Sequence, residues 1–195
     1  MAITDAVYQL LDEYPASWIQ KTIQPGDFLY QPADADAYVY WVEKGLIKIG
    51  SLGDLGQRVL YDLLKPGELF GDLNYLDEVT FFEYAQAATT TSVFAIEQQS
   101  FRQATTHNPV LAEWFNELII RRWHRAETRL LHRNGLAVND RIRYIQAQYN
   151  SLIIDANDQW QRPFDYLSYQ EVGDLVGATR QTVSRKLQTL EETYL

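Results

Sequence analysis

The chain has 195 residues, 46% of them hydrophobic, which is enough for one ordinary domain and a smaller second one. It has no cysteine, which excludes disulfides, thiolate metal sites and cysteine nucleophiles. Its net charge of −9 comes from the N-terminal half, because residues 1–100 carry 5 Lys and Arg against 15 Asp and Glu, whereas residues 101–195 carry 12 against 11. The acidic total therefore does not exclude a nucleic-acid partner for the second half.

The start of the chain carries no recognisable targeting signal. The segment MAITDAVYQLLDEYP lacks the positive region and the continuous apolar core of a signal peptide. No stretch of about 18 or more apolar residues occurs anywhere in the sequence. We therefore expect a cytoplasmic protein that does not use a membrane as a partner.

Short β-rich runs separated by turn signals fill residues 20–97. Glycine and proline mark the turns, at residues 25–27, 31–32, 43–45, 53–54 and 65–67. The runs between them are rich in β-branched and aromatic residues, as in Tyr38–Val42, Leu46–Ile49, Val59–Leu63 and Ser92–Ile96. This spacing predicts a compact antiparallel β-roll of the double-stranded β-helix type, which we place in residues 1–108.

The hydrophobic period changes after this region and predicts one long helix over residues 109–135. Its apolar residues recur every three or four positions and form a stripe, namely Leu111, Phe115, Ile119, Trp123, Ala126 and Leu130. The opposite side carries Arg121, Arg122, Arg125, Arg129 and Arg133. At the end of the helix, Gly135 is suited to a left-handed C-terminal cap.

The apolar stripe has two interpretations. It could pack against the roll, as amphipathic helices of single-chain proteins do. However, a helix this long extends beyond a small roll and needs a second apolar partner. We therefore expect the stripe to form the interface of a homodimer.

Residues 136–195 are expected to form a second, helical domain. A helix is predicted over residues 138–154, with Ile142, Ile145 and Tyr149 on one face. A polar connection at residues 157–163 follows it. The segment Leu167–Glu191 then fits two short helices joined by a sharp turn.

Capping residues and apolar spacing define these two short helices. Ser168 and Glu171 form a capping box at the start of the first, whose inner face is Val172, Leu175 and Val176. Gly177 suits the turn, and Thr179 is placed to cap the second helix. The buried face of the second helix is expected to be Val183, Leu187 and Leu190.

The other side of the second helix carries polar donors in its first turns, namely Arg180, Gln181, Ser184 and Arg185. In a helix-turn-helix these positions face base edges in the major groove. Arginine can donate two hydrogen bonds to guanine, and glutamine can pair with adenine. A purely structural helix would more often carry Glu–Lys pairs there, so the pattern favours a recognition helix over about residues 179–191.

The same segment resembles the recognition motif of the CRP/FNR superfamily of transcription regulators. Upstream motifs match in the family's order, namely Gly26-Asp27-x-Leu29-Tyr30, Gly45-x-Ile47-Lys48, Leu64-x-Pro66-Gly67-x-x-Phe70-Gly71, and Phe101 before His107-Asn108-Pro109. The resemblance covers about residues 20–192. It implies an α+β protein with an N-terminal roll, a long dimerisation helix and a C-terminal helix-turn-helix domain.

The resemblance also implies roles for individual residues. Base contacts would come from Arg180, Gln181 and Arg185, and phosphate-backbone contacts would come from Ser168, Tyr169, Thr179 and Thr182. The implied partners are double-stranded DNA, a second copy of the chain and RNA polymerase.

The sequence departs from the family pattern at two places. Many members carry glutamate where Gln181 stands, so the preferred half-site should differ. The family usually continues past the recognition helix into a β-hairpin wing, whereas this sequence ends at Leu195. We therefore expect the wing to be missing or shortened.

A candidate effector pocket follows from the resemblance as well. In cyclic-AMP-responsive members a Gly-Glu pair holds the ribose and an Arg-Ser pair holds the cyclic phosphate; the matching positions here are Gly71-Asp72 and Glu83-Tyr84. A carboxylate in place of arginine reverses the electrostatics at the phosphate, so we expect no cyclic-nucleotide binding in that mode. The roll could instead hold an uncharged ligand or be packed shut, with these aromatic residues inside it: Tyr75, Phe81, Phe82 and Tyr84.

Other function classes fit less well. A cupin-type enzyme would hold a metal with histidines inside the roll, but residues 20–100 contain neither His nor Cys. His107, His124 and His132 lie outside the roll and form no close ligand pair, so we expect no metal site, no cofactor and no enzymatic activity. The remaining alternative is a signalling or interaction protein that keeps the roll and the dimer helix without binding DNA. The acidic charge favours that alternative, and the arginines of the second helix oppose it.

Overall fold

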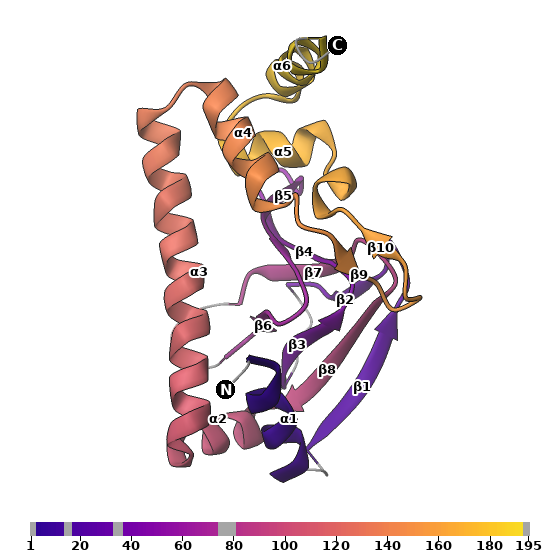
Figure 1. Ribbon diagram of the computed structural model, residues 1–195, viewed down its shortest axis with the longest axis vertical. Coiled ribbons are helices and arrows are strands. Elements are labelled where there is room, and N and C mark those ends of the chain that lie inside the picture. Colours follow the sequence, from indigo (N-terminus) through magenta and orange to yellow (C-terminus); the bar gives the residue numbers. More distant parts are fainter. Residues whose placement is uncertain (1–2, 14–16, 33–36, 74–80, 193–195) are drawn as a thin grey trace.

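The computed structural model describes residues 3–13, 17–32, 37–73 and 81–192. A β-roll lies at one end of the molecule, a long helix runs along its side, and a small domain lies at the other end (Figure 1). The order of elements confirms the predicted α+β class, with the roll first, then the long helix, then the helix-turn-helix. None of the described helices is long and apolar enough to span a membrane.

The roll consists of two four-stranded antiparallel sheets. The first has the spatial order β1-β8-β3-β6 and contains β1 (Trp18–Ile23), β8 (Thr91–Glu97), β3 (Tyr38–Lys44) and β6 (Leu69–Gly71). The second has the order β2-β7-β4-β5 and contains β2 (Phe28–Tyr30), β7 (Glu83–Ala87), β4 (Ile47–Leu52) and β5 (Arg58–Leu64). All four β-rich runs that the sequence predicts are strands. Their inward side chains form the core of the roll, which includes Tyr30, Tyr40, Val42, Ile49 and Phe70.

Gly45 shows why the turns of the roll need glycine. Its φ is +92°, and a Cβ at this position would lie 2.5 Å from the hydroxyl oxygen of Thr91. Glycine avoids both the left-handed strain and the clash. The close approach lets the backbone N–H of Leu46 donate to the hydroxyls of Thr89 and Thr91, at 3.0 and 3.1 Å. The turn thereby fixes the start of β4 beside the start of β8.

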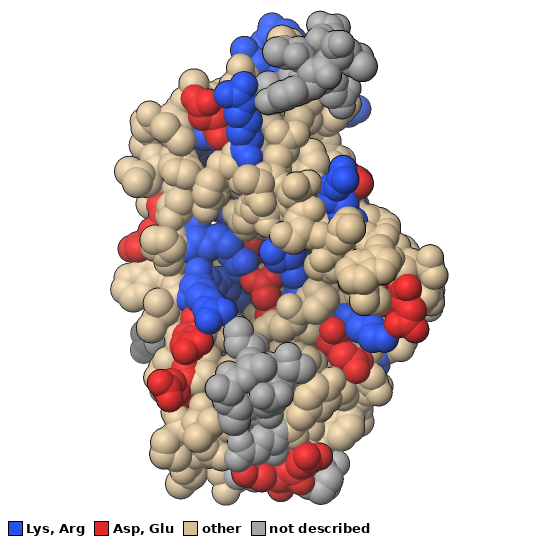
Figure 2. Space-filling view, viewed as in Figure 1, with Lys and Arg blue, Asp and Glu red and all other residues tan. Residues whose placement is uncertain are grey.

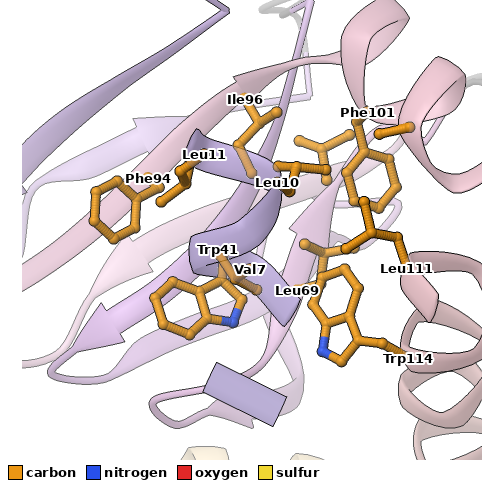
Figure 3. Packing of buried hydrophobic residues seen from close by; sticks show 12 residues of the cluster. Val7, Leu10, Leu11, Trp41, Leu69, Phe94, Ile96, Phe101, Leu111 and Trp114 are labelled. Atoms are coloured by element: carbon orange, nitrogen blue, oxygen red, sulfur yellow. The ribbon is translucent and has the colours of Figure 1, made fainter. Parts of the chain in front are cut away.

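Three helices cover the outer face of the first sheet, namely α1 (Ile3–Glu13), α2 (Gln98–His107) and α3 (Pro109–Gly135). Figure 3 shows the core that they share with β3 and β8. Leu10 of α1, Trp41 of β3, Phe101 of α2 and Leu111 of α3 are each at most 2% exposed. Full burial of one such side chain contributes about 1.5 to 3 kcal/mol. This cluster therefore anchors the first turns of α3 to the roll.

The bounds of α3 agree with the sequence, but its C-terminal cap does not. Asn108 caps the start, because its side-chain oxygen accepts hydrogen bonds from the N–H groups of Val110 and Leu111 at 3.0 and 3.4 Å. The helix ends at Gly135, which has no positive φ, and the following Leu136 is extended, with φ −116°. The predicted left-handed cap is therefore wrong, since the chain leaves the helix directly in an extended conformation.

The C-terminal domain contains α4 (Val138–Gln148), β9 (Ile153–Ile154), β10 (Trp160–Gln161), the 3-10 helix η1 (Pro163–Tyr166), α5 (Tyr169–Val176) and α6 (Arg180–Glu192). The predicted helix over residues 138–154 is too long, because β9 pairs with β10 in a hairpin. The Asp155 carboxylate accepts the backbone N–H groups of Asn157 and Gln159, at 2.9 and 3.0 Å. Such local bonds from an aspartate compete with helical ones and favour the turn.

The roll and the C-terminal domain share a third core. It joins Leu46, Leu60 and Leu63 of the roll to α4 and to the inner faces of α5 and α6. The predicted face of α4 is confirmed, since Ile142, Ile145 and Tyr149 are each at most 1% exposed. The C-terminal domain is therefore packed directly against β5 rather than attached only through α3.

Polar contacts with α5 reinforce this packing. The backbone N–H of Leu60 donates to the Asp174 carboxylate at 3.0 Å. The Lys48 ammonium pairs with the Glu171 carboxylate at 2.7 Å. Each of these contacts joins a strand of the second sheet, β5 or β4, to α5.

Candidate nucleic-acid interface

α5 and α6 form the helix-turn-helix that the sequence predicts. At the start of α5 the Ser168 hydroxyl accepts from the Glu171 N–H at 3.3 Å, and the Glu171 carboxylate accepts from the Ser168 N–H at 2.7 Å. This confirms the capping box. Gly177 ends α5 in the left-handed conformation, with φ +64°. The Thr179 hydroxyl then accepts from the Thr182 N–H at 3.2 Å, as expected of a helix cap.

The packing of the two helices leaves one side of α6 free. Val183 is fully buried and Leu187 is 8% exposed, both against the inner face of α5. The third predicted core residue of α6, Leu190, has a side chain outside the described part of the structure. α6 lies at the end of the molecule away from the roll, with α5 between them (Figure 1).

The three side chains predicted to contact bases project from this free side. Arg180, Gln181 and Arg185 are all exposed, and none makes a side-chain hydrogen bond or ion pair with another described residue. Their side-chain N–H groups therefore have no acceptor among the described residues, and they can donate to base edges. Structural arginines are instead expected to pair with carboxylates of their own chain.

The residues predicted to contact the phosphate backbone lie at the helix N-termini. Ser168 and Tyr169 are exposed at the start of α5, and Tyr169 is 42% exposed. Thr179 and Thr182 lie at the start of α6, with their hydroxyl oxygens 3.0 Å apart. Helix N-termini attract anions through their free N–H groups and the helix dipole. These residues therefore flank the exposed side of α6 with groups suited to phosphate.

The predicted dimer stripe is exposed along most of α3 but not at its start. Ile119, Trp123 and Leu130 are 38%, 63% and 61% exposed, and Ala126 is exposed too. Leu111 is fully buried against the roll, and Phe115 packs partly against the same core, so the assignment of Leu111 to a dimer interface is corrected.

Two exposed apolar residues of α3 extend the stripe beyond the set chosen from the sequence. Ile120 is 61% exposed and Leu131 is 68% exposed. Each directly follows a residue of the predicted stripe, so the apolar face is wider than the chosen spacing suggests. We call Ile119, Ile120, Trp123, Leu130 and Leu131 the exposed stripe.

The opposite side of α3 faces the roll. Arginine side chains on this side converge on one carboxylate, that of Asp62 of β5. The guanidinium of Arg129 lies 3.0 Å from this carboxylate and that of Arg125 lies 3.1 Å from it. Tyr149, the residue that follows α4, donates its hydroxyl hydrogen to Asp62 at 2.9 Å and also contacts Arg129. Asp62 is 4% exposed, so this network is almost completely removed from water.

Opposing effects set the ionisation of Asp62. Burial favours the neutral acid, but the charges of Arg129, Arg125 and Arg122 and the hydrogen bond from Tyr149 outweigh it and hold the pKa of Asp62 below its usual value. Burial, followed by the nearby Asp62 charge, raises the pKa of the Tyr149 phenol. At neutral pH the charged carboxylate of Asp62 on β5 therefore connects to the arginines of α3 and to the neutral phenol of Tyr149 after α4. The sequence shows the arginine spacing on α3 but offers no signal that Asp62 is its partner.

The structure separates the residues of the predicted effector pocket. Glu83 points into the roll, where the hydroxyls of Tyr30 and Tyr61 donate to it, the latter at 2.6 Å. Tyr84, the next residue of β7, points to the other face of the sheet, toward α5. Gly71 has φ +98° and lies against Tyr38 and Tyr40. Glu83 and Tyr84, two of the four predicted residues, therefore face opposite sides of the sheet.

Aromatic rings fill the interior of the roll beside Glu83. The ring centroids of Tyr40 and Phe70 lie 5.3 Å apart, and those of Tyr30 and Phe81 lie 5.4 Å apart. Phe81 packs against this core, whereas Phe82 is 56% exposed. Tyr75 lies outside the described residues. Among the described residues, these ring contacts favour the second of the two alternatives, a roll that is packed shut.

A β-roll followed by a long helix and a helix-turn-helix is the arrangement of a class of DNA-binding regulators. Comparisons with known proteins identify the family. Residues 20–108 match the family described as "Cyclic nucleotide-binding domain", and residues 166–195 match "Bacterial regulatory proteins, crp family". The chain belongs to the CRP/FNR superfamily and is a transcription regulator of the DNA-binding type.

Individual relatives support this assignment. The chain is 27% identical to the Cyclic AMP receptor protein of Thermus thermophilus over 177 residues, which is 90% of this chain and 79% of that protein. The fold is also that of FixK2 from Bradyrhizobium japonicum, with a TM-score of 0.71, 20% identity, and coverage of 90% of this chain and 85% of the other. The c-di-GMP responsive global regulator CLP of Xanthomonas campestris gives a TM-score of 0.75 at 18% identity, covering 96% and 93%. The expectation of a missing or shortened wing concerns residues after Glu192, which lie outside the described part of the structure.

Proposed function

We propose that this protein is a sequence-specific transcription regulator that binds double-stranded DNA as a homodimer, with α6 in the major groove. The observation that carries the proposal is that Arg180, Gln181 and Arg185 are exposed and make no side-chain hydrogen bond or ion pair with another described residue, while the other side of their helix packs into a core. The same observation opposes the alternative of a signalling protein without DNA binding. RNA polymerase is proposed as a further partner on the family resemblance.

A mobility-shift assay with randomised duplex DNA tests this proposal against the alternative. The wild-type protein should retard the duplex, and the double variant Arg180→Ala, Arg185→Ala should lose most of that binding at the same salt concentration. Fixed salt is essential because phosphate contacts make the affinity strongly dependent on ionic strength. Absence of any retardation at low salt would instead support the signalling alternative.

The exposed stripe supports the homodimer. Five large apolar side chains between 38% and 68% exposed lie on the part of α3 that follows its first turns, beyond the residues that the roll buries. A contiguous exposed apolar surface marks an interaction site. Two copies of α3 packed along this stripe would bury it symmetrically.

Trp123→Glu should convert the dimer to a monomer at micromolar concentration. The change places a charge in the centre of the stripe, and loss of a central aromatic contact typically costs about 2 kcal/mol or more of association free energy. Sedimentation velocity measures the outcome. Arg121→Glu is the matched control, since it changes the charge more but lies 62% exposed on the side away from the stripe. Dissociation in the control and not in Trp123→Glu would contradict the assignment.

Cyclic AMP and cyclic GMP should produce no saturable heat at submillimolar concentration in calorimetric titration. The Glu83 carboxylate stands where a phosphate-binding arginine is expected, and it is already held by two tyrosine hydroxyls. A buried carboxylate there repels a cyclic phosphate. Tight binding of either nucleotide would show that the phosphate position has been assigned to the wrong residues.

Gln181→Glu should move the base preference of the protein toward a cytosine-bearing pair. Glutamate can only accept hydrogen bonds, whereas glutamine both donates and accepts. The added negative charge should also lower the affinity for non-specific DNA. Binding selections on both proteins measure the change. Gln188→Glu is the control, because it adds the same charge to an exposed position further along α6; an equal shift in preference there would contradict the assigned role of Gln181.

A further inference from the structure

Arg141, near the start of α4, bridges the C-terminal ends of two other helices. Its Nη1 group donates a hydrogen bond to the carbonyl oxygen of Val176, the last residue of α5, at 2.7 Å. The same group donates to the carbonyl oxygen of Arg133, in the last turn of α3, at 3.3 Å. α4 follows the end of α3 and lies against α5 (Figure 1). One side chain therefore connects the long helix to the helix-turn-helix.

Both acceptors of Arg141 need a donor from outside their own helix. The last four carbonyl groups of a helix have no intrahelical donor, and they carry the negative end of the helix dipole. Among the described residues Arg141 forms no ion pair with a carboxylate. Its Nε is buried and has no acceptor in this part of the chain. The two helix ends are therefore the protein groups that hold this guanidinium.

The end of α3 also touches the turn of the helix-turn-helix directly. A Cβ atom at Gly177 would lie 2.7 Å from Nε of Arg133 and 3.0 Å from its Cδ. The space between α3, α4 and α5 is lined in part by His132 and Tyr144, whose ring centroids are 4.5 Å apart, and only about 10 Å³ of it is open. The junction around Arg141 is therefore closely packed.

Arg141 holds a different part of α5 from the part that the roll holds. Glu171 and Asp174 join the start and middle of α5 to β4 and β5. Arg141 instead holds Val176, next to the turn that leads into α6. Apolar packing between the domains is not directional, whereas a hydrogen bond restricts both the distance and the angle between donor and acceptor. Arg141 is therefore placed to fix the angle between α3 and α6.

We propose that Arg141 is a positioning residue for DNA recognition, which sets the orientation of α6 relative to α3 and thereby the spacing between the half-sites that a dimer binds. This inference rests on the proposed function, because the spacing depends on two copies of α3 packed together. Figure 2 shows Lys and Arg side chains at the end of the molecule that contains α6, so the direction of this end decides where a duplex lies. One additional base pair between the half-sites moves them about 3.4 Å apart and rotates one of them by about 35°. Only a domain that can reorient would accept both spacings.

Distances between two nitroxide labels in one chain test the orientation without DNA. The chain has no cysteine, so Arg121→Cys on α3 and Gln188→Cys on α6, both at exposed positions, introduce the two labelling sites. Dilution with unlabelled protein removes distances between copies. Pulsed electron spin resonance should give a narrow distance distribution with Arg141 present, and Arg141→Met, which removes the donors, should broaden it. Arg143→Met removes the same charge from an exposed position of the same helix and should leave the distribution unchanged.

A selection among palindromic duplexes whose half-sites differ only in spacing tests the consequence for DNA. Reorientation of the domain must break the bond from Arg141 to Val176, and one charge-assisted hydrogen bond corresponds to about tenfold in an equilibrium constant. Arg141→Met should therefore lower the preference for one spacing over its neighbours by about tenfold, while the preferred bases within each half-site stay the same. Arg143→Met should keep the wild-type preference.

The outcomes separate the role of Arg141 from DNA binding itself. A distance distribution in Arg141→Met as narrow as that of wild type, or an equal broadening in Arg143→Met, would overturn the positioning role. An equal loss of affinity on all spacings would also overturn it, because it would show an effect on stability alone. A wild type that selects no DNA site would contradict the proposed function instead, and the label distances would then decide the role of Arg141. If Arg141→Met does not fold, Arg141→Gln, whose shorter side chain cannot span the two carbonyl groups, decides in the same way.

Discussion

Arg180→Ala should weaken binding to the preferred DNA site by about 1 to 3 kcal/mol and relax discrimination at one base pair. Arg180 is exposed at the first position of α6, and its guanidinium makes no hydrogen bond or ion pair with another described residue. Its removal therefore leaves the fold unchanged and takes away only the contacts with DNA. Binding selections on both proteins at one salt concentration measure the affinity and the preference together.

Thr182→Ala provides the comparison for this prediction. The Thr182 hydroxyl lies beside that of Thr179 at the N-terminus of α6, where it suits a phosphate rather than a base. Its loss should weaken all sequences by a similar and smaller amount. Equal losses on all sequences for Arg180→Ala would show that this helix does not contact bases as proposed.

Asp62→Ala should lower the free energy of unfolding by about 3 to 5 kcal/mol, the usual effect of removing one partner from a buried ion pair. The change leaves Arg125 and Arg129 in a nearly dry site without the carboxylate that both contact. It also deprives Tyr149 of the acceptor that ties α4 to the roll. Urea denaturation at neutral pH measures the change. Asp54→Ala, at an exposed turn, is the control and should stay within about 0.5 kcal/mol of wild type.

The same carboxylate should make stability depend on pH in a defined direction. The pKa of Asp62 is lower in the folded state than its usual value, so its contribution is complete above the ordinary aspartate pKa of about 3.9. The contribution is lost as the pH falls below that value toward the pKa of the folded state. The difference between wild type and Asp62→Ala should therefore shrink as the pH is lowered below about 4. A difference that grows on acidification would contradict the assigned ionisation.

The elements with strong local signals are the ones that sequence alone predicts well. The capping box at Ser168, the turn at Gly177 and the cap at Thr179 each depend on neighbouring residues, and all three are present. The helix predicted over residues 138–154 wrongly includes β9, because Ile153 and Ile154 continue an apolar pattern. Short apolar runs do not distinguish a strand from a helix end.

The features that sequence could not predict depend on contacts between distant elements. Leu111 and Trp123 belong to one helical stripe, yet Leu111 is buried by the roll and Trp123 is exposed, because the roll covers only the first turns of that face. Asp62 precedes Arg125 by 63 residues and Tyr149 by 87, so no local pattern links them. The side chains of Glu83 and Tyr84 point away from each other for a simpler reason, since adjacent residues of a strand face opposite sides of the sheet.

A binding selection from fully randomised duplex DNA, with the wild-type protein at one fixed salt concentration, tests the central claim most directly. Two copies of α6 related by a two-fold axis should enrich a palindromic site whose half-sites lie about 10 base pairs apart, one turn of the double helix. A guanine should recur in each half-site, where Arg180 is expected to donate its two hydrogen bonds. A pool that remains unenriched after repeated rounds, or that binds only in proportion to its length, would contradict sequence-specific recognition by this protein.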